Sequence, residues 1–221
     1  MKLRKKCLIL DHDDTIINSQ ESIHYPLFVD VLKILRPNII PIDFEKFIEL
    51  SNELGFVKMC RMLYHYNEKE IQFEYEHWKI HSSLIEAPAF EGIKEFLTAF
   101  IEIGGVIIVY TMNSKQNVIR DYERLFNFVP NRIISHDQYY ILRKPYRLSI
   151  LKELHNLNLT VEDCIFIDDT PMLLELKHRL NMDFIAANWA KSANPLWKKF
   201  NHDELVLNHP QELWKHVFIK E

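Results

Sequence analysis

Short apolar runs that alternate with helical patterns constrain the fold of this chain most strongly. The runs are residues 6–10 (KCLIL), 106–110 (VIIVY), 164–167 (CIFI) and 184–187 (FIAA). Runs this short, without alternation of apolar and polar residues, predict strands buried on both faces of a sheet. The segments between the later runs carry apolar residues at helical spacing. We therefore predict an α/β fold with a Rossmann-like parallel sheet core and helices on both of its faces.

Residues 17–87 have a different pattern, because apolar residues recur there at helical spacing and no strand-like run occurs. Asp43 is a predicted N-cap of one helix, and Asn67 with Glu70 predicts a capping box at another. Gly55 interrupts the pattern between them. We predict an all-helical insertion of three to four helices at residues 17–87, inside a core formed by residues 1–16 and 88–221.

Charge and composition exclude several classes of function. The 27 basic and 31 acidic residues give a net charge of −4, so no nucleic-acid partner is expected. No apolar run approaches the roughly 20 residues that a membrane span requires, so we expect no membrane association. Cys7, Cys60 and Cys164 are odd in number and far apart. They predict reduced core thiols in a cytoplasmic protein.

Four polar clusters follow the predicted strands or the loops after them. They are residues 11–15 (DHDDT), 111–114 (TMNS), 144–145 (KP) and 168–169 (DD). The carboxyl ends of parallel strands share one crevice, where ligands bind. We therefore expect carboxylates, a lysine and a hydroxyl from distant parts of the chain to meet at one edge of the sheet.

This set of groups predicts a cation and a phosphoryl group as ligands. Several ionised carboxylates cannot lie together without a compensating positive charge. An all-oxygen set suits a hard cation, and Mg²⁺ typically takes one or two carboxylates, waters and a substrate phosphate. The Thr111 hydroxyl and the Lys144 ammonium are suitable donors to phosphate oxygens.

The four motifs LILDHDDT, VIIVYTMNS, RKP and CIFIDDT stand in an order that resembles the haloacid dehalogenase-like hydrolase superfamily, in its phosphatase branch with a helical cap. The resemblance implies that the insertion is the cap and that Mg²⁺ is the cofactor. It implies catalytic roles for Asp11, Asp13, Thr111 and Lys144. Asp11 is the expected nucleophile, which forms an aspartyl phosphate, and Asp13 is the expected general acid and base.

The resemblance also implies the metal ligands. They are Asp11, the backbone carbonyl of Asp13, and an acid of the last motif. We expect Asp169 to bind the metal directly and Asp168 to bind it through water, with the order within this pair left open.

Three positions depart from the family's pattern. Asp14 stands where the family usually has glycine, and Asp tolerates a left-handed backbone better than most residues do. His12 replaces an apolar residue, and Asn113 lies one place later than the usual asparagine.

We assign substrate binding to His12, which we expect to face the cap, to Met112 and Asn113 in the second motif, and to Arg61 on the insertion. Lys58 and His65 lie near the same predicted helix face as Arg61 and are further candidates.

The expected function is Mg²⁺-dependent hydrolysis of a phosphate monoester, with a small phosphorylated metabolite as the partner. A phosphomutase of the same superfamily shares every core residue, and a non-catalytic phospholigand-binding descendant is the alternative from another class. The sequence leaves the identity of the substrate and the oligomeric state open.

Overall fold

The computed structural model describes residues 2–193, 197 and 204–219. The chain forms two compact units. The first, called the core, comprises Met1–Asn18 and Ala89–Glu221. The second, called the helical unit, comprises Ser19–Pro88.

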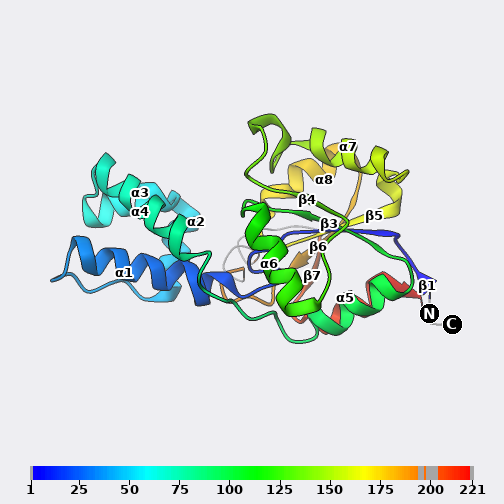
Figure 1. Ribbon diagram of the computed structural model, residues 1–221, viewed down its shortest axis with the longest axis horizontal. Helices are drawn as coiled ribbons and strands as arrows, with labels where there is room; N and C mark the ends of the chain where they lie inside the picture. The colour runs from blue at the N-terminus through cyan, green and yellow to red at the C-terminus, as the bar shows by residue number, and fades with distance from the viewer. Residues whose placement is uncertain (1, 194–196, 198–203, 220–221) are drawn as a thin grey trace. The chain divides into compact units, whose positions relative to one another are not determined.

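A six-stranded parallel sheet forms the centre of the core (Figure 1), with the strand order β4-β3-β2-β5-β6-β7. Its strands are β2 (Cys7–Leu10), β3 (Val106–Tyr110), β4 (Arg132–Ile134), β5 (Cys164–Asp168), β6 (Asp183–Ala187) and β7 (Leu205–Leu207). All of β2 is buried, because Ile9 pairs in register with Ile108 on one side and Phe166 on the other. This position in the middle of the sheet explains the unbroken apolar run of β2.

Helices cover both faces of the sheet, with α5 and α6 on one face and α7 and α8 on the other (Figure 1). The bounds are α5 (Ile93–Glu102), α6 (Lys115–Phe126), α7 (Arg147–Asn156) and α8 (Leu174–Leu180). Short helical turns are η2 (Tyr140–Leu142), η3 (Val161–Asp163) and η4 (Pro171–Leu173). The segment at residues 171–180 therefore begins as a 3₁₀ turn and continues as α8. The predicted α/β fold class is confirmed.

The two ends of the core meet in a separate antiparallel pair, β1 (Lys2–Leu3) with β8 (Phe218–Ile219). Before β8 come η5 (Pro210–Glu212) and α10 (Leu213–Val217). Trp214 and Phe218 stack on each other and contact Phe96 of α5 edge-on, so this C-terminal segment packs against one helix layer of the core.

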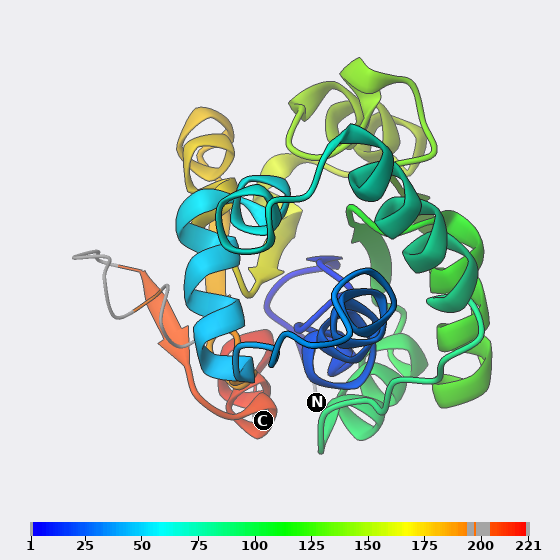
Figure 2. The same cartoon turned by 90° about the vertical axis from the view of Figure 1, so that its left-hand side faces the viewer.

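The helical unit contains a π-helical turn and four α-helices, which run from blue to teal in Figure 2. They are η1 (Gln20–His24), α1 (Tyr25–Leu35), α2 (Phe44–Leu54), α3 (Phe56–Tyr64) and α4 (Glu68–His81). The predicted caps form, since Asp43 accepts from Lys46 N at 2.8 Å and Asn67 makes a capping box with Glu70. Within the described residues, no helix is long and apolar enough to cross a membrane.

Candidate active site

The first motif forms a tight loop directly after β2. The Asp11 amide donates to the carbonyl of Ile167 in β5 at 3.0 Å, which extends the pairing of the two strands by one residue. Asp14 then adopts a left-handed backbone with φ 55°, and its amide donates to Ile17 at 2.8 Å. The Asp14 carboxylate accepts from the hydroxyl of Ser192. The turn therefore forms with aspartate in a conformation that favours glycine.

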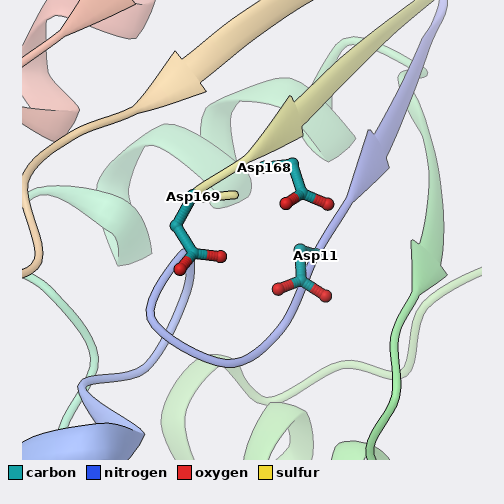
Figure 3. Close-up of side chains that lie close together, drawn as sticks. All are labelled: Asp11, Asp168 and Asp169. Atoms are coloured by element: carbon teal, nitrogen blue, oxygen red, sulfur yellow. The ribbon is translucent and has the colours of Figure 1, made fainter. Parts of the chain in front are cut away.

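Three carboxylates converge at the carboxyl ends of β2 and β5 (Figure 3). Oxygens of Asp11, Asp168 and Asp169 lie within 4.8 Å of one another, and all three residues are buried. The buried ammonium of Lys144 lies 2.6 Å from Asp168 Oδ2 and 3.1 Å from Asp11 Oδ1. The adjacent ends of the parallel strands thus bring together groups that are far apart in the sequence.

The pKa values of these groups indicate that the site holds more negative than positive charge. Burial raises the pKa of Asp11 to about 7, with Lys144 opposing this effect and Asp168 adding to it. Burial also raises the pKa of Asp169 well above its ordinary value, and Asp11 contributes further. Burial disfavours the charged form of Lys144, but Asp11 and Asp168 outweigh it and raise its pKa. One ammonium does not neutralise three buried carboxylates, so the donor set fits a divalent hard cation such as Mg²⁺.

Asp168 and Asp169, the two acids of the last motif, differ in how many hydrogen bonds their carboxylates accept. Asp168 Oδ1 accepts from the amide and the hydroxyl of Thr170 at 2.9 and 2.8 Å, while its Oδ2 is held by Lys144. Asp169 Oδ1 accepts one longer bond, of 3.4 Å, from the hydroxyl of Thr15. Asp169 therefore has more capacity left to bind a cation directly.

Asn113 holds the side chain of Asp13. Its Nδ2 lies 3.1 Å from each carboxylate oxygen of Asp13. Its Oδ1 accepts from the amide of Ser114 at 2.8 Å and from Nδ2 of Asn117 at 2.9 Å. Both ends of the Asn113 amide are engaged within the protein, and its contact with substrate stays a prediction.

Thr111 and Met112 are placed differently from each other. Thr111 is fully buried at the end of β3, and its Oγ1 accepts from the amide of Asn113 at 3.0 Å. That contact leaves the hydroxyl hydrogen of Thr111 for another acceptor. The side chain of Met112 is 49% exposed.

The expectation that His12 faces the cap is wrong. Its side chain is fully buried, and Nε2 lies 3.2 Å from Asp121 Oδ2 on α6. The ring also stacks on Tyr122 of the same helix, at 5.9 Å between centroids. The charge of Asp121 is shared with Arg120, whose Nε donates to it at 3.0 Å. A polar partner inside the core thus draws His12 away from the crevice.

The three candidates on the insertion all lie exposed on α3 or at its end. Arg61 makes an ion pair of 2.6 Å with Glu68, and His65 ends the helix in a left-handed conformation. Lys58 is exposed. The assignment of substrate binding to Arg61 stays a prediction.

Several supporting residues were not predicted from the sequence. Thr170 and Thr15 each bond an acid of the carboxylate cluster, and Asn117 holds the amide of Asn113. A signal was present for residue 170, because an aspartate side chain commonly accepts from the backbone amide two residues later in a turn. For Asn117 the signal was weaker, namely a polar residue in the first turn of the helix that Ser114 caps.

Residues 8–187 match the family described as haloacid dehalogenase-like hydrolase. The chain belongs to this family. The predicted family is thereby confirmed, and the match spans all four motifs from β2 to β6. A search of curated proteins finds no match to the chain.

Solved structures of the family share the fold over nearly the whole chain. A predicted phosphoglycolate phosphatase from Haemophilus somnus 129PT is 13% identical with a TM-score of 0.77, and 96% of this chain and 98% of that one are covered. CbbY from Rhodobacter sphaeroides in complex with phosphate is 16% identical with a TM-score of 0.70, over 95% and 96% of the two chains. A haloacid dehalogenase-like hydrolase from Streptococcus pneumoniae is 15% identical with a TM-score of 0.67, over 96% and 98%. The prediction of a phosphatase agrees with the family and with these neighbours.

Proposed function

We propose that this protein is a Mg²⁺-dependent phosphate monoester hydrolase that acts on a small phosphorylated metabolite through an aspartyl phosphate. The observation that carries the proposal is the arrangement of Asp11. Its carboxylate lies 3.1 Å from the ammonium of Lys144, beside two further buried acids, at the ligand-binding edge of a parallel sheet. The phosphate-bound CbbY structure, which has the same fold, supports a phosphorylated ligand.

In the first step an oxygen of Asp11 attacks phosphorus, and the bond from phosphorus to the alcohol oxygen breaks. Asp13 donates a proton to the departing alkoxide. In the second step water attacks the phosphorus of the aspartyl phosphate, Asp13 takes the proton from that water, and the Asp11 carboxylate is released with inorganic phosphate. The single carboxylate therefore serves as acid and then as base.

The surrounding groups support these two steps. Asn113 holds the carboxyl of Asp13 in one orientation, so its proton is delivered from a fixed position. Lys144 and the hydroxyl of Thr111 are suited to hold the phosphoryl oxygens. Mg²⁺, when bound by Asp11, Asp169 and the carbonyl of Asp13, would neutralise charge on the carboxylates and the phosphate.

We also propose a cytoplasmic location, which the buried free thiols Cys7, Cys60 and Cys164 support because thiols stay reduced there. In this proposal the four core motifs bind phosphate and metal, so we further propose that the helical unit supplies the groups that recognise the alcohol part of the substrate.

Hydrolysis of p-nitrophenyl phosphate tests the proposal. The purified protein is expected to release p-nitrophenol with Mg²⁺ and to lose this activity in excess EDTA, with activity returning when Mg²⁺ is added back. A panel of phosphorylated metabolites, assayed for released phosphate, then ranks natural substrates. No turnover of any phosphate ester would favour a non-catalytic binding protein. Conversion of a sugar phosphate into its isomer without net phosphate release would favour a phosphomutase.

A further inference from the structure

The helical unit contains a pocket of its own, with a volume of about 300 Å³. All of its lining residues fall between Gln20 and Trp78, inside the unit formed by Ser19–Pro88. Four aromatic side chains line it, together with one carboxyl and one imidazole; they are Phe47, Phe56, Tyr75, Trp78, Glu74 and His24. Its volume is at the lower end of the range for small-molecule sites, so it suits a small ligand.

Glu74 is the unusual member of this lining. Its side chain is 8% exposed, and it makes no hydrogen bond or ion pair with any residue that the structure describes. Burial raises its pKa to about 7, and the nearby His24 opposes this effect. A buried carboxyl without a partner destabilises the folded chain, and an apolar residue would remove that cost. The group is therefore better explained by a ligand than by stability.

The aromatic rings beside Glu74 are held in place. Trp78 Nε1 donates to His24 Nδ1 at 2.9 Å, and the two rings stack at 6.0 Å between centroids. Tyr75 packs against Trp78 at 6.2 Å. Ordered aromatic faces beside a carboxylate are the surroundings in which proteins recognise organic cations, through the negative face of each ring and the opposite charge.

We propose that this pocket, within the helical unit, binds a small organic ammonium group. Binding of this group does not depend on the proposed hydrolase function.

Direct binding tests the pocket without any turnover. Choline is titrated into the full-length protein and followed by tryptophan fluorescence and calorimetry, beside its uncharged isostere 3,3-dimethylbutanol. Wild-type protein is expected to bind choline with at least about tenfold preference over the isostere. Glu74→Gln should remove that preference. The control Glu76→Gln changes an exposed acid on the same helix, and it should behave as wild type.

Either of two results would overturn the proposal that this pocket binds an ammonium group. One is equal affinity of wild type and Glu74→Gln for choline, and the other is equal affinity of wild type for choline and for the isostere. Circular dichroism of Glu74→Gln establishes that the variant is folded. If this variant does not fold, Trp78→Leu serves as the second variant, because loss of an aromatic face should also lower choline affinity.

Discussion

Replacing Glu74 by glutamine is expected to stabilise the helical unit at pH 8 and to change its stability little below pH 4.5. The carboxyl has an ordinary pKa of 4.5 in the unfolded chain, and burial raises that value to about 7 in the folded one. The folded state therefore binds more protons between these two pH values. Stability of the wild type must then fall as pH rises through this interval and stay low above it. Glutamine does not titrate, so the variant lacks this loss.

The size of the effect follows from the interval between the two pKa values. At 1.36 kcal/mol for each pH unit, the interval corresponds to about 3 kcal/mol at full deprotonation. A change of this size is a large fraction of the stability of a small helical unit.

Urea unfolding measures the effect. Wild type, Glu74→Gln and the control Glu76→Gln are unfolded at pH values from 4.5 to 8, and tryptophan fluorescence with far-ultraviolet circular dichroism follows the transition. The free energy of unfolding of Glu74→Gln, minus that of wild type, should increase as pH rises. The same difference for Glu76→Gln should not change with pH. A difference between wild type and Glu74→Gln that is constant across this range would refute the argument that Glu74 is buried without a partner.

Three further predictions concern the core. Asp11→Asn should abolish turnover because the amide cannot attack phosphorus, and Asp13→Asn should lower kcat by about 10²–10⁴-fold; near-full activity of Asp11→Asn in steady-state assays would exclude a covalent step through that residue. In Mg²⁺ titrations of activity, Asp168→Ala should raise the Mg²⁺ concentration needed for half activity by about 10–100-fold, as loss of a residue that supports the metal ligands does. Asp169→Ala should raise that concentration more, and the reverse order would exchange the roles of the two acids. Asn113→Ala should lower kcat at least about tenfold with little change in KM, because it orients Asp13; a raised KM at unchanged kcat would instead assign Asn113 to substrate binding.

The arrangement of the core was accessible from the sequence because its signals are local. Each strand of the sheet centre is an apolar run bounded by turn residues, and the cap residues Asp43 and Asn67 bond the helices that they were expected to begin. The convergence of Asp11, Lys144 and Asp168 also followed from sequence, since parallel strands bring their carboxyl ends to one edge.

The direction of a loop side chain was not accessible in the same way. His12 stands between two expected catalytic residues, and the pattern of the motif favoured a position at the crevice. Its partner Asp121 lies 109 residues later in the chain. Asp121 also appears in the sequence as one polar residue among several on α6. The bond between them depends on how α6 packs on the sheet, and no local pattern contains that information.

The pocket of the helical unit shows a signal that was present and was passed over. Charge alone directed attention to Lys58, Arg61 and His65, which are exposed. Glu74 lies three residues after Ile71 and four before Trp78, so it shares the apolar stripe of α4 with them. An acid on the stripe that packs inward must be buried, and a buried acid must be protonated, paired within the chain or met by a ligand. The described residues provide no hydrogen bond or ion pair for Glu74, so protonation and a bound ligand are the two ways that remain.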